Sequence, residues 1–116
     1  MTINSKDKGA RYEREIANYF RDYGYDAHRT AQFRGNTGQA ADVEGVPRIH
    51  IECKHQERLQ PYEWMEQAIR DAKAAGKGDK PVVLMRKNGK ETLVVMRLDD
   101  WREMYTEWSN GWQTEE

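Results

Sequence analysis

The chain contains a single cysteine, Cys53, so no disulfide can form within it. This excludes the small secreted domains that disulfides hold together and is typical of a protein from a reducing compartment. No apolar run approaches the roughly 20 residues that a membrane-spanning helix needs. The opening residues, MTINSKDKG, hold no apolar stretch of the kind found in a signal peptide. We therefore expect a cytoplasmic, intracellular protein without a membrane partner.

The sequence also lacks a zinc pattern and a strong excess of positive charge. The three histidines have no zinc-site spacing with Cys53. The net charge is −1, which gives no general attraction for a polyanion. The charge is uneven, because residues 99–116 hold six acids and one base, which leaves a balance of +4 for the rest. The charge therefore permits nucleic-acid binding without requiring it.

The length and the turn signals predict one α/β domain. A chain of 116 residues fits one domain, with residues 1–7 and 109–116 as loose termini. Gly24 ends the first helical pattern, and Pro61 and Gly76 delimit the second. The element order favours a mixed central sheet of about five strands flanked by helices in three layers. The expected helices are 8–23, 61–75 and one capped by Asp99, and the expected strands are 25–31, 40–45, 48–55, 81–86 and 91–98.

The run HIECKH, residues 50–55, alternates polar and apolar side chains. Successive strand residues point to opposite faces, so His50, Glu52 and Lys54 share one face. By itself this pattern is typical of a solvated sheet face with an ordinary charge pair. In a three-layer protein few strand residues meet open solvent, and we expect the first helix to cover this polar face. Cys53 points the other way and is interpreted as a packing residue.

The first helical pattern turns one glutamate toward the body of the protein. The residues that share one face of the helical wheel are Glu13, Ile16, Ala17, Phe20 and Tyr23. Glu15 lies on the opposite face. An ionised carboxylate on an apolar face is costly unless it is paired or binds a cation. The alternative is a glutamate near the first turn, eased by the helix dipole and by Arg14.

Asp42 and Glu52 fall on neighbouring antiparallel strands of the expected sheet, where Glu13 can join them. Three converging carboxylates repel one another, and a divalent cation removes that cost. Oxygen ligands suit Mg²⁺, with Mn²⁺ as a substitute. Such an ion polarises a phosphodiester and activates water, and Lys54 beside it can position that water and offset transition-state charge. The residues therefore predict phosphodiester hydrolysis without a covalent intermediate and without a small-molecule cofactor.

Two parts of the chain resemble known nucleases. The spacing Asp42-x9-Glu52-x-Lys54 resembles the core motif of the PD-(D/E)xK nuclease superfamily. Residues 8–31 are similar to the opening of the archaeal-type Holliday-junction resolvases, and the matching positions are Lys8-Gly9, Glu13-Arg14-Glu15, Gly24-Tyr25 and Arg29. The similarity spans roughly residues 8–97 and becomes an agreement in element order past Lys54.

The resemblance implies a restriction-endonuclease-like fold and a homodimer that acts on branched DNA with Mg²⁺. It implies that Glu13, Asp42 and Glu52 hold the metal together with the backbone carbonyl of Cys53, that these acids and Lys54 are catalytic, and that Lys8, Arg14, Arg29 and Arg34 meet DNA. The chain departs from such resolvases in being less basic and in having Ala41 where they have proline. These departures bear on junction specificity more than on nuclease chemistry.

Other interpretations remain open. A nuclease of the same fold that acts on flaps, mismatches or duplex sites would not discriminate four-way junctions. A catalytically silent DNA-binding domain would bind DNA without metal dependence. The last helix carries a stripe of Trp101, Met104, Tyr105 and Trp108, interpreted as core or as a subunit contact, and a protein-interaction module would use it. A compact resolvase suits a virus or mobile element as well as a cell.

Overall fold

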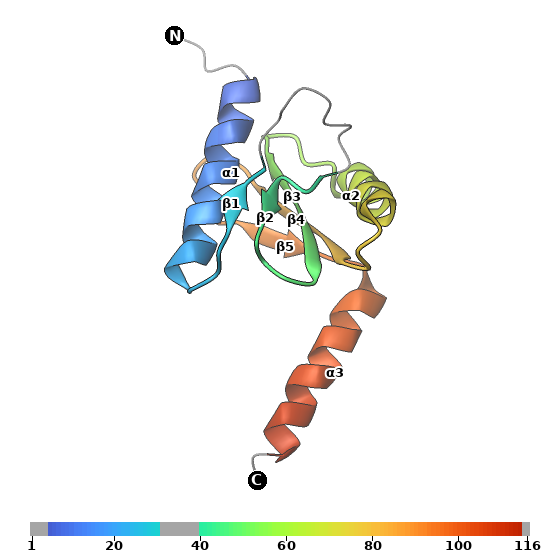
Figure 1. Cartoon of the computed structure of the whole chain (residues 1–116). Coiled ribbons are helices and arrows are strands. Elements are labelled where there is room, and N and C mark those ends of the chain that lie inside the picture. Colours follow the sequence, from blue (N-terminus) through green and yellow to red (C-terminus); the bar gives the residue numbers. More distant parts are fainter. Residues whose placement is uncertain (1–4, 31–39, 115–116) are drawn as a thin grey trace.

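The computed structural model describes residues 5–30 and 40–114 of the chain (Figure 1). Helices and strands follow the order that the sequence predicts. They are α1 (Ser5–Asp22), β1 (His28–Arg29), β2 (Val43–Glu44), β3 (Ile49–His55), α2 (Pro61–Ala75), β4 (Lys80–Arg86), β5 (Leu93–Val95) and α3 (Leu98–Thr114). The expected α/β class with a mixed sheet of five strands is confirmed.

The sheet is built around one long parallel strand pair. Its strand order is β1-β2-β3-β4-β5, and β3 and β4 run parallel over their whole lengths, from Ile49 opposite Lys80 to His55 opposite Arg86. The other neighbouring strands are antiparallel. A parallel pair needs a long crossover, and α2 supplies it between β3 and β4. The two long strands therefore form a rigid centre, with short strands at both edges.

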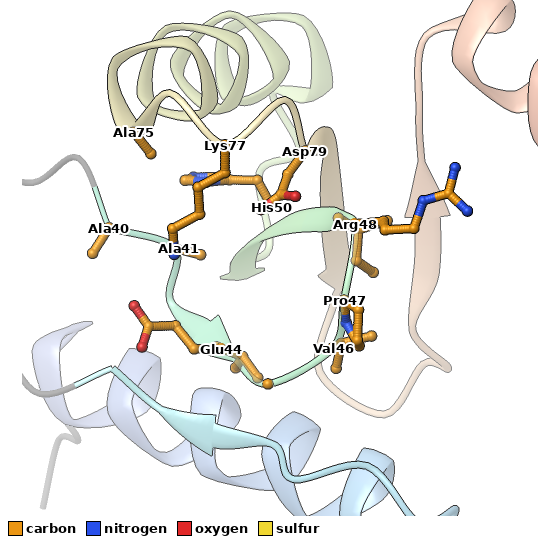
Figure 2. Close-up of a pocket in the computed structure, with 13 residues that line it drawn as sticks. Ala40, Ala41, Glu44, Val46, Pro47, Arg48, His50, Ala75, Lys77 and Asp79 are labelled. Atoms are coloured by element: carbon orange, nitrogen blue, oxygen red, sulfur yellow. The ribbon is translucent and has the colours of Figure 1, made fainter.

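The turn between β2 and β3 depends on a glycine. Gly45 has φ +93°, and a Cβ atom there would lie 1.9 Å from the carbonyl oxygen of Asp26. Only glycine allows the turn to come this close to the segment before β1. Figure 2 shows the turn, with the Arg48 side chain directed away from the hollow that the turn borders. The turn thus fixes β2 between β1 and β3.

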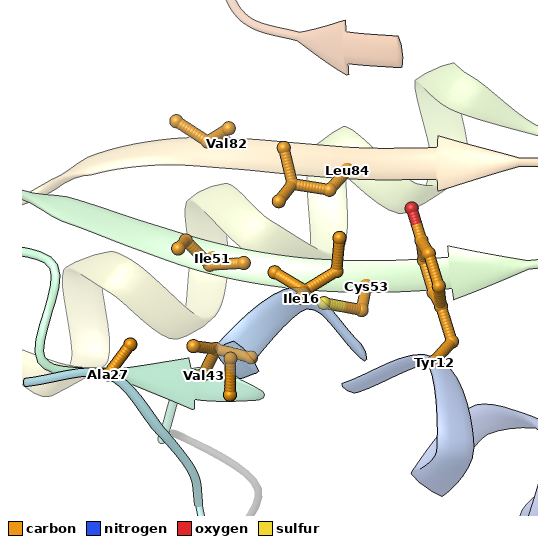
Figure 3. Packing of buried hydrophobic residues seen from close by; sticks show 9 residues of the cluster. Tyr12, Ile16, Ala27, Val43, Ile51, Cys53, Val82 and Leu84 are labelled. Atoms are coloured by element: carbon orange, nitrogen blue, oxygen red, sulfur yellow. The ribbon is translucent and has the colours of Figure 1, made fainter. Parts of the chain in front are cut away.

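The apolar core lies between α1 and one face of the sheet (Figure 3). Alternate residues of β3 and β4 supply this face, and Tyr12 and Ile16 of α1 pack on it. The buried members of the cluster are Tyr12, Ile16, Ala17, Ala27, Val43, Ile51, Cys53, Val82 and Leu84. Val83 and Met85 point to the other face and pack against Trp64 and Met65 of α2. The helices α1 and α2 therefore cover opposite faces of the sheet.

The expectation that the first helix covers the polar face of β3 is wrong. The face that α1 covers is the apolar one, which carries Ile51 and Cys53. The polar face meets α2 instead, where Lys54 Nζ lies 3.5 Å from Gln67 Oε1. The physical reason is that α1 buries its own apolar stripe best against apolar strand residues.

The apolar stripe of α1 is also rotated from the expected one. Tyr12 is only 1% exposed, and its hydroxyl lies 2.8 Å from Thr92 Oγ1 in a hydrogen bond. Tyr23, expected on the inward face, is 70% exposed. The centre of the stripe therefore runs through Tyr12 and Ile16, which places Glu13 at its margin, next to the edge of the sheet.

The last helix differs from expectation in extent and in packing. It continues to Thr114, whereas residues from Ser109 onward were expected to be loose, and α1 likewise already begins at Ser5. Residues 115 and 116 lie outside the described part. Figure 1 shows α3 projecting away from the sheet and the other two helices. Trp101 and Trp108 are 51% and 55% exposed, so the interpretation of this stripe as core is wrong.

No helix in the described part of the chain is both long enough and apolar enough to cross a bilayer.

Candidate active site

A cavity of about 830 Å³ opens between the first turns of α1 and the second half of β3. Acidic and basic side chains from both elements reach it, together with residues that flank β1 and β2. The lining residues are Lys6, Lys8, Gly9, Ala10, Glu13, Arg29, Asp42, Cys53, Lys54, His55, Gln56 and Glu57. Three of the four expected catalytic side chains, those of Glu13, Asp42 and Lys54, therefore share one cavity.

Asp42 lies directly before β2, and its backbone is paired with the chain segments on both sides. Its backbone N–H donates to the Ile51 carbonyl at 2.8 Å, and its carbonyl accepts from Thr30 N–H at 3.0 Å. Its side-chain Oδ2 accepts a hydrogen bond from the Cys53 backbone N–H at 2.8 Å. The expectation that Asp42 and Glu52 lie on neighbouring antiparallel segments is confirmed. Backbone and side chain of Asp42 are thus both held against β3.

Burial is the main electrostatic influence on Asp42. Burial first, and then the nearby charge of Glu52, raise the pKa of the Asp42 carboxyl from its ordinary 3.8 to about 7. The hydrogen bond from Cys53 N–H and the charge of Lys54 lower the pKa in part. In the absence of a cation this carboxylate is therefore only partly ionised at neutral pH.

Glu13 approaches Asp42 from α1. Its side chain is 14% exposed, and Arg29 Nε donates to Glu13 Oε1 at 2.8 Å. Burial first, and then the charge of Asp42, raise the pKa of the Glu13 carboxyl, while Arg29 and Arg14 oppose the rise. Glu13 and Asp42 thus act on each other electrostatically, as expected from the helical wheel. The alternative, a glutamate stabilised by the helix dipole and Arg14, does not account for the hydrogen bond with Arg29.

Glu52 reaches the same acidic group from the other face of β3. It is 3% exposed and interacts with Asp42 both as a charge and through a side-chain hydrogen bond. Asp42, whose backbone is paired with Thr30 on one side and Ile51 on the other, interacts as a charge with both Glu13 and Glu52. Asp42 therefore interacts with both of the other predicted acids, but among the described residues the ligand atoms of Glu13, Asp42 and Glu52 do not all lie within 4.8 Å of one another.

The donor set of this group fits a hard divalent cation. It consists of carboxylate oxygens, and burial and mutual repulsion disfavour the ionised forms of Asp42 and Glu13 when no cation is bound. A cation that shares these oxygens would remove the repulsion. The role of the Cys53 carbonyl as a further ligand remains a prediction, and what the structure shows is the Cys53 N–H bound to Asp42.

The expected DNA contacts are distributed unevenly around the cavity. Lys8 and Arg29 line it, and Arg14 is exposed on α1 outside the lining. Arg34 lies outside the described residues. Lys6, which the sequence analysis did not select, also lines the cavity.

A family comparison agrees with this geometry. Residues 4–115 match the model of a family described as "Phage putative PDDEXK endonuclease". The chain belongs to this family of phage PDDEXK endonucleases. The PD-(D/E)xK resemblance inferred from Asp42, Glu52 and Lys54 is thereby confirmed at the level of the family.

One of the solved structures that match the chain has a similar architecture. The structure of Hjc from Archaeoglobus fulgidus, described as a Holliday junction resolvase from an archaeal hyperthermophile, is 23% identical with a TM-score of 0.55. The match covers 74% of this chain and 73% of that one. At this identity the likeness shows the fold, and it confirms the expected restriction-endonuclease-like arrangement. No curated protein sequence matches the chain.

A further group of possible ligands lies around Glu52, and it includes His50, which shares the polar face of β3, and Asp71, which was not among the predicted site residues. His50 is 3% exposed, and its Nε2 lies 3.1 Å from Glu52 Oε1. One ligand atom from each of His50, Glu52 and Asp71 lies within 4.8 Å of the others, a grouping that could also hold a cation. Asp71 follows Gln67 by four residues on α2, so both face β3. This spacing is visible in the sequence, but only once α2 is known to cover the polar face.

A second hollow, of about 630 Å³, lies at the opposite end of β3 (Figure 2). The turn after β2 and the end of α2 border it, and its charged lining residues are Glu44, Arg48, Lys77 and Asp79. Among the described residues its two acids, Glu44 and Asp79, come from different segments and are not among the acids that gather at Asp42. None of the four residues expected to be catalytic is among the residues that line this hollow.

The raised pKa of Asp42 makes the stability of the metal-free protein depend on pH. Between its ordinary pKa of 3.8 and about pH 7, the folded state binds more protons at Asp42 than the unfolded state does. The free energy of unfolding should therefore fall as the pH rises through this window, by at most about 4 kcal/mol. Asp42→Asn should flatten this fall, as measured by urea unfolding from pH 4 to pH 8 in EDTA.

The matched control for this titration is Asp99→Asn, which removes an exposed carboxylate on α3. It should keep the wild-type pH profile. Adding Mg²⁺ or Mn²⁺ should raise the melting temperature of the wild type more at about pH 8 than at about pH 5, because protons compete with the cation. A wild-type profile retained in Asp42→Asn would contradict the assignment of the pH dependence to this residue.

Removal of the His50 donor should destabilise the protein through Glu52. His50→Leu leaves Glu52 Oε1 buried without that partner, and we expect a loss of about 1–3 kcal/mol in the free energy of unfolding. His50→Gln keeps an N–H donor and should lose less. Guanidinium unfolding followed by far-UV circular dichroism measures both. Equal losses would show that packing of the ring, and not its hydrogen bond, is what matters.

Proposed function

We propose that this PDDEXK endonuclease hydrolyses phosphodiesters in branched DNA at four-way junctions, with Mg²⁺ as cofactor and Mn²⁺ able to substitute. The observation that carries the proposal is that Glu13, Asp42 and Lys54 line one cavity together with basic side chains, while the buried Glu52 interacts with Asp42. Membership of a nuclease family supports the hydrolysis. The fold shared with a protein described as a Holliday junction resolvase supports the choice of substrate.

Glu13, Asp42 and Glu52 would hold the metal, with the Cys53 carbonyl as a further ligand. When bound, such an ion polarises the phosphodiester and activates water for attack. The Asp42 carboxylate is held in place before a metal binds, because Cys53 N–H of β3 donates a hydrogen bond to it. A set of acids held in this way needs little rearrangement as charge develops in the reaction.

Lys54 is placed to act on the attacking water. It lines the cavity on the same strand as Glu52, and its charge acts on Asp42. Contact with Gln67 at 3.5 Å holds its Nζ near α2. From this position the ammonium can orient a water and offset negative charge on the phosphate in the transition state.

The rim of the cavity supplies the phosphate contacts. Lys6, Lys8 and Arg29 line it on the α1 side, where DNA phosphates would be neutralised. Arg14 lies exposed one residue beyond Glu13 and can extend this surface. Arg34, which lies outside the described residues, is proposed as a further DNA contact. The acidic α3 projects away from the sheet and from α1, whose first turns line the cavity (Figure 1).

A homodimer would place two such sites on opposed strands of one junction. Cleavage of a four-way junction into two duplexes requires two symmetric nicks, and two-fold symmetry provides two equivalent sites. Two alternatives give different outcomes in the same assay: a nuclease for flaps, mismatches or duplex cuts linear substrates too, and a silent domain binds without cutting.

The decisive measurement is cleavage of an immobile four-way junction against the matching linear duplex, both end-labelled. Wild-type protein with Mg²⁺ should give paired, symmetric nicks in the junction alone, and EDTA should abolish them. Glu52→Gln should lose cleavage by at least about 100-fold, since one ligand of the metal is lost. Lys54→Ala should lose rate while retaining metal binding.

Each contrary result of this assay has its own meaning. Equal cleavage of junction and duplex would retain the nuclease and reject the junction preference. Binding without cleavage in Mg²⁺ and Mn²⁺ would reject the enzyme. Normal cleavage by Glu52→Gln would reject the site assignment.

Glu13 and Glu15 form a matched pair on α1 for testing the role of Glu13. Glu13→Gln should reduce junction cleavage strongly, because Glu13 faces Asp42 in the cavity. Glu15→Gln should leave the rate nearly unchanged, because Glu15 is 57% exposed and pairs with Arg86 outside the acidic group. Initial rates at saturating Mg²⁺ provide the comparison. Equal effects of the two substitutions would refute the assignment of Glu13.

A further inference from the structure

The helix α3 is held to the body by its acidic side. Lys80 bridges Asp100, at 3.6 Å, and Glu103. Glu107 lies 3.9 Å from Arg48 in the turn before β3. These three acids follow one another at three and four residues, so they form one side of the helix. Of the apolar side chains of α3, Met104 and Trp108 border a hollow beside this attachment.

A second side of α3 carries an exposed aromatic stripe. Its members and exposed fractions are Leu98 75%, Trp101 51%, Tyr105 44%, Trp108 55% and Trp112 57%. Neighbouring rings contact one another along the helix: Trp101 and Tyr105 are stacked at a centroid distance of 5.2 Å, whereas Tyr105–Trp108 at 5.7 Å and Trp108–Trp112 at 4.1 Å are tilted pairs. The side chains thus already support one another in a single row before any partner binds.

The spacing of this stripe is that of a coiled-coil seam. The intervals from Leu98 to Trp112 are three, four, three and four residues, which is the alternation of a and d positions in two heptads. A helix that packs on its own domain shows a wider stripe, whereas a narrow a/d seam is typical of pairing with another helix. The seam therefore favours a helical partner.

The charges on α3 suit a second copy of the same helix. The positions that flank the seam are Arg102, Met104, Ser109 and Gly111, none of which is acidic. The acids of the described helix, such as Glu103 and Glu107, lie on its other sides. Two copies can therefore meet along the seam without like-charge repulsion between acids, while the acidic flanks would repel DNA.

We propose that the α3 seam, defined as Leu98, Trp101, Tyr105, Trp108 and Trp112, pairs with the α3 seam of a second copy in an isologous two-fold dimer. Aromatic side chains bury roughly 150–250 Å² each, so two half-exposed seams cover on the order of 1,000 Å² on pairing, the lower range of specific interfaces. The hollow of about 480 Å³ that Met104 and Trp108 border beside the body leaves room for side chains of the partner.

This inference specifies where the homodimer of the proposed function forms, and its test needs no DNA. Sedimentation velocity of the full chain over a hundredfold dilution in the micromolar range should show twice the 13.7 kDa chain mass at the upper end. The double variant Trp101→Glu/Trp108→Glu should sediment as a monomer at every concentration, because two charges would enter the seam. Its control is Thr106→Glu, an exposed change on another side of α3, which should remain dimeric.

Three outcomes would overturn the proposal. They are a monomeric wild type, a dimer that persists in the double variant, and dissociation of the Thr106→Glu control. Circular dichroism of each variant verifies that its helix content is retained. A wild-type monomer that still nicks DNA would reject the α3 interface and retain the proposed nuclease activity. A dimer that does not cleave DNA would retain the interface and reject the nuclease activity. Dilution of the wild type should also shift its tryptophan emission to the red, a readout independent of any substitution.

Discussion

The hydrogen bond from Cys53 N–H to the Asp42 carboxylate is the contact on which the site depends. It ties the segment before β2 to the central strand β3 and fixes the position of the carboxylate. Held there, Asp42 interacts as a charge with Glu13 of α1 and with Glu52, which points to the opposite face of β3 from the one that α1 covers.

Burying these carboxylates destabilises the folded protein, and the packing around the central strands offsets this. Burial raises the pKa of Asp42 and of Glu13, so the ionised site opposes folding when no cation is present. The long parallel pair β3–β4, covered by α1 on one face and α2 on the other, supplies the compensating apolar burial. His50, itself buried, adds a hydrogen bond to Glu52 from the second face. Proteins commonly combine an unfavourable group at a functional site with stabilising packing elsewhere.

The distribution of charge separates two surfaces of the molecule. Lysines and an arginine surround the cavity near α1, while the acids of the C-terminal part gather on α3, which projects away from it. A net charge of −1 therefore does not describe what a phosphate meets at the cavity. The aromatic seam of α3 is likewise remote from the acids of the site, so assembly and hydrolysis can be tested by separate substitutions.

The sequence by itself determined the element order, the mixed sheet and the residue set of the PDDEXK motif. Alternation in β3 assigns Glu52 and Lys54 to one face whatever surrounds them, because successive strand residues point to opposite sides. Only the tertiary structure decided what covers each face. The choice of α2 for the polar face, the central place of Tyr12 in α1, and the exposure of Trp101 and Trp108 depend on which surfaces pack together. The periodicity of the sequence shows which residues share one face of a helix or strand. Which other element covers that face depends on how the whole chain packs.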